Sequence, residues 1–375
     1  MPLDLDLGVE LAIADDPAGV GAPTATDTGF LLHSTTQVGA PATMQKVRSP
    51  AHAREIYPLE PALQASIDAW FGAGGSRLYV MKLGTDELAA ANAFDPTLGP
   101  GQLMAPEVVL TADQVPLRDW AWDNNRIYVA QGADGATQAA LTTQADALTD
   151  IEGGRFSMLE ADILRIPGLA PGSTRDVGAS VVKAALIARS DRITGNPNLA
   201  AAGNHTPGAG GETRYVLGIK NERSTTVQKA LAQAQVNSFR TVAGRVRSYG
   251  FWTLADLDAL PHWWDMGGSR TVMAVRAREQ AVAEEMMFGQ VAADGAFLDK
   301  YKGALSGVLS EFQRLGAIYG TDNDPGYAVD VGIGVNPLEN VAAGLITAVI
   351  TLRTSPFAAA LKITLTRRAI TDRVV

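Results

Sequence analysis

Large hydrophobic residues occupy every second position from Leu3 to Ile13, within the first sixteen residues of the chain. A period of two is typical of a half-buried β-strand, in which successive side chains point to opposite faces. The apolar face carries Leu3, Leu5, Leu7, Val9, Leu11 and Ile13. Asp4 and Asp6 lie on the other face, and Pro17, Gly19 and Gly21 then end the alternation. We therefore expect an N-terminal β-arm that joins the body through a hinge at these last three residues.

The same alternation returns near the C-terminus, with the opposite charge. Leu361, Ile363 and Leu365 share one face, and Lys362 lies on the other. Residues 1–16 contain five acidic side chains and no basic one, whereas residues 353–375 contain five basic side chains, Arg367 among them, and one acidic side chain. An isolated strand must find a sheet edge for its backbone groups. Each strand could pair within its own subunit, or the acidic strand could meet a basic one between subunits, which the charges favour.

Between these ends, the pattern changes repeatedly between helical and extended periods. We expect helices at 58–71, around 141–148, and at 177–189, 224–236, 278–291 and 295–316. We expect strands at 28–33, 77–83, 108–111, 126–131, 270–277, 327–335 and 345–352. No steady alternation of strand and helix is evident, so the expected class is α+β, a mixed helix-and-sheet subunit without a doubly wound sheet.

The expected division of the chain has two compact domains and two arms. An N-terminal β-arm and hinge cover 1–20, an α/β domain covers 21–223, an α+β core domain covers 224–354, and a C-terminal β-arm covers 355–375.

Composition excludes several kinds of chemistry. The 375 residues include no cysteine, which removes disulfides, Cys-ligated zinc and thiol nucleophiles together. The net charge of −9 disfavours a general role on nucleic acid or on an anionic membrane surface. No apolar run approaches the roughly 18 residues of a membrane span, and the start of the chain lacks the pattern of a signal peptide. We therefore expect a soluble protein.

A glycine-rich stretch at Gly72 to Gly75 raises the question of a phosphate-binding loop. Such a loop follows a strand and precedes a helix, so that the phosphate meets the helix N-terminus. Here the order is reversed, because a predicted helix precedes the glycines and a strand follows them. Gly72 suits the left-handed position of a helix C-cap, and Gly74 and Gly75 suit a sharp reversal. We interpret the stretch as a turn.

No residue set has the pattern of a strong catalytic or metal site. The four histidines are scattered and none has metal-ligand spacing. His262 and Asp265, in the segment HWWD, could form the acid–base pair of a hydrolase, but two adjacent tryptophans more often indicate packing or an interface. We expect a protein that is not an enzyme and that uses no cofactor and no metal.

Several blocks of the chain, taken together, resemble contractile tail sheath proteins, those of contractile-tailed bacteriophages and of related contractile injection systems. Residues 26–58 and 63–83 are similar to the N-terminal pattern of that family, in which a strand, a small-residue turn, a helix, an aromatic-Gly-Gly turn and a strand follow one another. The segments KAALIARSDRITGNPNLAAAGN (183–204), QVNSFRTVAGRVRSYGFWTLA (235–255), SRTVMAVRAREQAVAEEM (269–286) and FQRLGAIYG (312–320) follow in the family's order. Tyr249-Gly250 stands where the family has Trp-Gly, and Trp252 stands for an arginine.

The resemblance implies a structural role without ATP consumption. Subunits of this family stack as hexameric rings around a tail tube and contract to drive the tube through a cell envelope, while their terminal arms exchange strands into an inter-subunit mesh. The implied partners are further copies of the chain, the tail tube protein, and the baseplate and tail terminator proteins, with no nucleic acid and no membrane insertion. The implied location is the virion tail, assembled in the host cytoplasm; a bacterial injection device stays open as the alternative machine.

The resemblance also suggests which residues serve assembly. The inter-subunit arm contacts would be Leu3, Asp4, Leu5, Asp6, Leu7, Val9, Leu361, Lys362, Ile363, Leu365 and Arg367, with the hinge at Pro17, Gly19 and Gly21. On the predicted helix 295–316, Lys300, Lys302 and Arg314 would contact the tube, or they form an ordinary solvated helix face. Three other functions stay open: a non-contractile filament, a hydrolase using His262 and Asp265, and a small-molecule binder using Gly74-Gly75.

Overall fold

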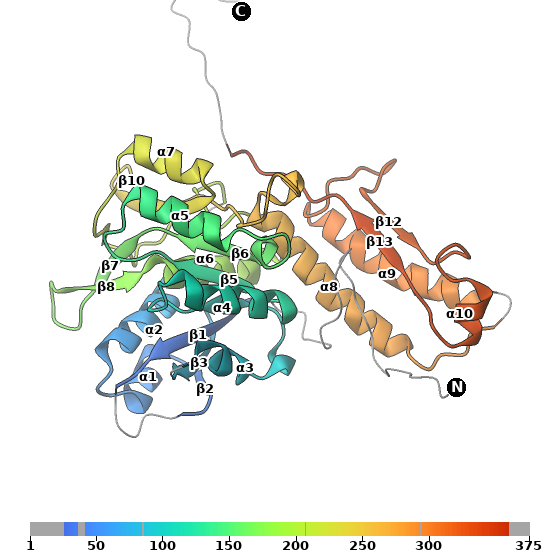
Figure 1. The fold of residues 1–375 in the computed structure, drawn as a ribbon, viewed down its shortest axis with the longest axis horizontal. Helices are drawn as coiled ribbons and strands as arrows, with labels where there is room; N and C mark the ends of the chain where they lie inside the picture. Colours follow the sequence, from blue (N-terminus) through green and yellow to red (C-terminus); the bar gives the residue numbers. More distant parts are fainter. Residues whose placement is uncertain (1–25, 37–41, 85, 207, 293–294, 360–375) are drawn as a thin grey trace, which may run out of the picture.

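The computed structural model describes residues 26–36, 42–84, 86–206, 208–292 and 295–359. Figure 1 shows an α/β body built on one large sheet and a smaller helical unit that extends from one side of it. Helix α8 extends from the body into the smaller unit, where it lies alongside α9 (Figure 1). The molecule therefore has a sheet-based part and a part built on two long helices.

The body contains an eight-stranded sheet in the order β11-β10-β6-β5-β4-β1-β3-β2. Every pairing from β10 to β3 is parallel, and only the two edge strands β11 and β2 are antiparallel to their neighbours. The strands are β1 (Thr28–Ser34), β2 (Gln45–Val47), β3 (Arg77–Leu83), β4 (Gln102–Met104), β5 (Ile127–Gln131), β6 (Ser157–Glu160), β10 (Val236–Val242) and β11 (Arg245–Tyr249).

Helices cover both faces of this sheet. Along β1, Leu31 packs into the hydrophobic cluster of one face, and Phe30 and Leu32 pack into that of the other. The first face carries α1 (Pro50–Ile56), α2 (Pro61–Ala73) and α6 (Ala179–Thr194), and the second carries α3 (Glu87–Asn92), α4 (Thr111–Asp123), α5 (Gln138–Leu148) and α7 (Thr225–Gln233). The mixed helix-and-sheet class is confirmed, but the expectation that the chain lacks a doubly wound sheet is wrong. The strands expected at 28–33, 77–83 and 126–131 are confirmed as β1, β3 and β5, but β4, β6 and β10 were missed, so the alternation of strand and helix was not evident from the sequence.

Smaller elements complete the body. A three-stranded sheet has the order β8-β7-β9, with β7 at Ile163–Pro167, β8 at Thr174–Gly178 and β9 at Gly218–Ile219. Three 3₁₀ turns lie at Pro96–Leu98, Gly153–Phe156 and Pro261–Trp263. The strand expected at 108–111 is wrong, because these residues lead into α4 and the nearby strand is β4.

The smaller unit has its own hydrophobic cluster. It consists of α8 (Met266–Met286), α9 (Ala296–Arg314), α10 (Leu338–Ala342) and a two-stranded sheet of β12 (Tyr327–Asp330) and β13 (Val349–Leu352). Leu305, Leu309 and Phe312 of α9 pack against Val275 of α8 and Val329 of β12. The helix expected at 295–316 is confirmed. Strands β10 and β11, which the expected division placed in 224–354, pair with the main sheet.

The strand expected at 270–277 is wrong, since these residues are the first half of helix α8. Asp265 caps this helix by accepting a hydrogen bond from the backbone N–H of Gly268 at 2.6 Å. All residues from 270 to 277 except Val272 are buried. A helix buried on every side shows no polar stripe, so its sequence carries no helical period.

The glycine stretch is a turn, as expected. Helix α2 ends at Ala73, and Gly74 takes the left-handed conformation of its C-cap with φ of 105°. The left-handed residue is therefore Gly74, and the expectation that Gly72 takes this role is wrong. A Cβ at Gly75 would lie 2.3 Å from the ring of Trp70, so the turn also lets the backbone approach that side chain closely.

Candidate assembly site

The two-stranded sheet of the smaller unit has one covered and one exposed face. Val329 of β12 pairs with Ile350 of β13, and both side chains face the cluster that includes α9. Ala328 and Thr351 pair on the opposite face and are exposed. The alternation of apolar and polar residues along these strands produces this arrangement.

Both outer edges of this sheet are open within the part of the chain that the structure describes. Beyond their own pairing, residues 327–330 and 349–352 make no backbone hydrogen bond to another described segment. A two-stranded sheet alone is only marginally stable, and unpaired strand edges are templates for a further strand. The apolar side chains of Leu345 and Val349 beside this edge are 56% and 47% exposed. The geometry suits the addition of a strand.

The segment that follows β13 is fixed to the body by an aromatic cluster. The ring of Phe357 lies 4.8 Å from Trp264 and 6.1 Å from both Phe251 and Trp252, measured between ring centroids. Aromatic pairs at such distances stabilise by about 0.5–1.5 kcal/mol each beyond their buried area. The first residues of the predicted C-terminal arm are therefore held against the segment that leads into α8.

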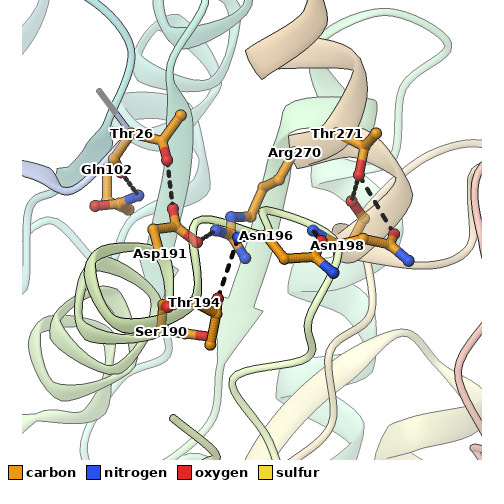
Figure 2. Close-up of polar contacts among 10 residues, drawn as sticks. Thr26, Gln102, Ser190, Asp191, Thr194, Asn196, Asn198, Arg270 and Thr271 are labelled. Atoms are coloured by element: carbon orange, nitrogen blue, oxygen red, sulfur yellow. Dashed lines mark hydrogen bonds and ion pairs between the residues drawn. The ribbon is translucent and has the colours of Figure 1, made fainter. Parts of the chain in front are cut away.

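A buried ion pair lies beside this cluster (Figure 2). Arg270 of α8 is fully buried and donates a hydrogen bond from Nη2 to Asp191 of α6. The other carboxylate oxygen of Asp191 accepts a hydrogen bond from Thr26 Oγ1 at 2.6 Å. Burial raises the pKa of Asp191, and its contacts with Arg270 and Thr26 oppose that rise. The carboxylate joins helix α8 to the strand end where the described chain begins.

Two asparagines after α6 hold the other end of the chain. Asn196 Nδ2 donates to the backbone oxygen of Leu315 at 2.7 Å, and Asn198 Nδ2 donates to that of Ser355 at 2.6 Å. Thr271 of α8 lies 3.4 Å from Asn198 Oδ1 (Figure 2). The loop after α6 therefore contacts the end of α9, the start of α8 and the segment after β13.

Three solved structures show what this fold is similar to. The sheath of an extracellular contractile injection system, the PVC sheath complex in its contracted state, gives a TM-score of 0.74 at 17% identity over 93% of both chains. The helical sheath of the anti-feeding prophage in its contracted state gives 0.71 at 15% identity over 97% of this chain and 99% of that chain. A sheath tail protein from Desulfitobacterium hafniense gives 0.58 at 10% identity over 86% and 93%. No protein-family model and no curated protein sequence matches the chain.

The chain has the fold of a contractile sheath subunit. The resemblance inferred from the ordered sequence blocks is thus confirmed as a fold. The coverage of both chains is nearly complete, so the body and the smaller unit both belong to this sheath fold.

The sheath-like block at 183–204 covers all of α6 after its first turn and the loop that follows it. Arg189 donates from Nη2 to the backbone oxygens of Gly210 and Glu212, at 2.6 and 2.9 Å. Gly195 ends the helix in the left-handed conformation, with φ of 64°. Arg189 of this family-like block therefore joins α6 to the loop at 210–212 within the subunit.

The two residues of the hydrolase hypothesis have different surroundings in the structure. His262 is exposed and its ring lies against Trp263, with centroids 6.1 Å apart. Asp265 is buried and caps α8, and no hydrogen bond or ion pair joins it to His262 among the described residues. Burial raises the pKa of Asp265 to about 6, while hydrogen bonds from the backbone of Gly268 and Gly267 oppose the rise. The carboxylate has a structural task.

The three cations proposed for the tube contact are exposed on α9. At 3.6 residues per turn, Lys300 and Arg314 share one stripe of this helix, and Lys302 lies on its opposite flank. The structure thus brings two of the three side chains to one face. Their contact with a tube stays a prediction.

The predicted arm and hinge residues lie outside the described residues. These are Leu3, Asp4, Leu5, Asp6, Leu7, Val9, Pro17, Gly19, Gly21, Leu361, Lys362, Ile363, Leu365 and Arg367. Within the described ranges, no helix is long and apolar enough to cross a membrane, and no group of three or more His, Asp or Glu side chains could hold a metal ion.

Proposed function

We propose that this chain is the structural subunit of a contractile sheath. Subunits would stack as hexameric rings around a tail tube, and the lattice would release stored energy by a rigid-body transition that drives the tube through the target envelope. The observation that carries this proposal is the near-complete coverage shared with two sheaths solved in their contracted state. Sheath neighbours also favour a structural role over an enzymatic one.

The open edges of the β12–β13 sheet support the exchange of arms between subunits. A strand of about six residues gains roughly five hydrogen bonds at about 1 kcal/mol each, together with the burial of three apolar side chains. Ordering the strand costs about 1–2 kcal/mol for each residue. Because these quantities nearly balance, an arm is expected to dock only when a neighbour offers such an edge.

The partners follow from this role. They are further copies of the chain, a tail tube protein, and baseplate and tail terminator proteins. Solved structures of anti-feeding prophage baseplates contain chains with this fold. Lys300 and Arg314 are our candidates for the tube contact, together with the predicted Lys302. The proposed location is a virion tail, assembled in the host cytoplasm, or the equivalent sheath of an injection device.

Truncation tests the arm proposal. We expect chains lacking residues 1–16, or residues 360–375, which spares the packed Phe357, to fold as monomers and to form no long tubes by negative-stain electron microscopy. A point variant sharpens this test, because Ile363→Pro removes a backbone donor from the C-terminal arm and Ile363→Val preserves it. Long tubes from the truncated chains or from Ile363→Pro would overturn the arm proposal. Tubes of a single diameter under every solution condition would favour a non-contractile filament.

A further inference from the structure

The two ends of the described chain meet at the same turns of helix α8. Thr26, the first described residue after the predicted N-terminal arm, binds Asp191, and Asp191 binds Arg270 of α8. Ser355, at the start of the predicted C-terminal arm, binds Asn198, and Asn198 Oδ1 lies 3.4 Å from Thr271, the next residue of α8. Figure 2 shows Thr26, Asp191 and Arg270 joined in a row by dashed lines, with the contact between Thr271 and Asn198 beside them. We call these five residues the layer between α6 and α8.

The backbones around this layer are in close contact. A Cβ at Gly267 would lie 2.5 Å from the backbone oxygen of Asn198, and a Cβ at Gly268 would lie 2.8 Å from Thr354 Oγ1. Ser355 also donates its backbone N–H to Ala317 at 2.9 Å. Glycine is therefore required where α8 passes between the loop after α6 and the segment leading to the C-terminal arm.

An ordinary core contact would not need charge at this place. Replacing a buried ion pair with apolar residues of similar volume is often neutral or stabilising, whereas removing one partner is strongly destabilising. Arg270 Nε and Nη1 are buried without a hydrogen bond among the described residues, so the guanidinium group loses contacts with water that the protein does not fully replace. The pair does fix the relative position of two segments, because one oxygen of Asp191 accepts a hydrogen bond from Thr26 and the other accepts one from Arg270 of α8.

We propose that Thr26, Asp191, Arg270, Asn198 and Thr271 form an anchor that fixes the roots of both terminal arms to helix α8. By roots we mean the segments at which the arms join the body, residues 26–30 and 353–359. This inference rests on the proposed exchange of arms between subunits. An arm docked on a neighbour transmits force to the point where it enters the body. A pull on the N-terminal arm then reaches α8 through Asp191, and a pull on the C-terminal arm reaches it through Asn198, so that each subunit couples its two arms mechanically.

Hydrogen exchange of the unassembled full-length chain tests the anchor independently of any tube. We expect Asp191→Asn to raise exchange at both roots, in peptides covering 26–30 and 353–359, by about tenfold or more, and to leave α5 at its wild-type rate. The milder Thr26→Val removes one hydrogen bond and keeps the side-chain shape, so it reports on the same coupling in a chain that folds. Asp162→Asn is the matched control, because Asp162 forms a buried pair with Arg223 away from this layer.

Exchange that rises at 26–30 alone in both variants would overturn the coupling of the two roots. A uniform rise over all peptides in Thr26→Val would also overturn it, since it would indicate general destabilisation. The transmission of force through the anchor is then tested by passing assembled tubes through a narrow needle and measuring tube length by electron microscopy. We expect shorter tubes from Thr26→Val than from the wild type, and equal lengths would overturn this transmission of force. Failure of the wild type to form tubes would count against the proposed function alone, because the exchange result does not depend on assembly.

Discussion

Glu279 of helix α8 gives the protein a predictable dependence on pH. Its side chain is 1% exposed, and neither carboxylate oxygen has a hydrogen-bond partner among the described residues. Burial raises the pKa of Glu279 to about 8, and the charge of Arg278 opposes the rise. The carboxyl group therefore keeps its proton at neutral pH in the folded chain. The change Glu279→Gln preserves the size of the side chain and removes its titration.

The direction and size of the effect follow from proton linkage. Below about pH 4.5, the ordinary value for this side chain, both the folded and the unfolded chain hold the proton. Between about 4.5 and 8 only the folded chain holds it, so unfolding releases a proton and the free energy of unfolding falls as the pH rises. A gap of about 3.5 between the two pKa values corresponds to about 5 kcal/mol, which is an upper limit. The stabilisation is complete below pH 4.5 and is lost above pH 8.

Urea unfolding of the wild type and of Glu279→Gln between pH 5 and 9 measures this effect. Because other buried carboxyl groups also titrate, the quantity to follow is the difference between the two chains at each pH. We expect the variant to become progressively more stable than the wild type as the pH rises, with most of the gain below pH 8. The exposed Glu285 on the same helix is the control, and Glu285→Gln should change stability by no more than about 0.5 kcal/mol at any pH. A difference that stays constant from pH 5 to 9 would refute the reasoning.

Two further predictions concern α8, α9 and the hydrolase hypothesis. Gly267→Ala should lower the free energy of unfolding by about 1–3 kcal/mol, because its Cβ would meet the backbone oxygen of Asn198. Gly303→Ala, on the open face of α9, should raise the free energy of unfolding by up to about 1 kcal/mol. Denaturant unfolding measures both variants, and equal effects would contradict this reasoning. His262→Ala should change the free energy of unfolding by no more than about 0.5 kcal/mol and should leave tube formation unchanged, since the side chain is exposed. If the wild type hydrolysed a substrate and this variant did not, the result would favour an enzyme.

The sequence predicted elements whose burial is one-sided. Helix α9 buries Leu305, Val308, Leu309 and Phe312 at spacings of three and four residues, and this amphipathic stripe is visible without a structure. Helix α4 escaped prediction because Pro116 lies inside it. Three parallel strands of the sheet, β1, β3 and β5, were predicted at 28–33, 77–83 and 126–131, whereas β4, β6 and β10 were missed. The first half of α8 was mistaken for a strand because residues buried on all sides carry no helical period.

The anchor could not be predicted from the sequence, because its members meet only in the folded chain. Asp191 and Arg270 are 79 residues apart, and Thr26 is 165 residues from Asp191. One signal was present, since Lys183 interrupts the apolar run from Val181 to Ala188 in the helix that also carries Asp191. Charged side chains in such a segment are seldom buried without a partner. That pattern indicates a buried polar network, although it does not identify the partners.

The doubly wound sheet raises the question of why this body should be a scaffold and not a ligand-binding domain. Sheets of this kind bind ligands outside the carboxyl ends of the strands where the strand order reverses, which here lies between β1 and β4. At the described part of this edge, the Glu107 carboxylate accepts the backbone N–H of Ser34 at 2.7 Å and lies 3.3 Å from His33 Nδ1. A phosphate placed there would compete with Glu107 for that N–H and would meet the negative charge of its carboxylate. Glu107 thus disfavours an anionic ligand at this edge, which favours a scaffold over a phosphate-binding domain.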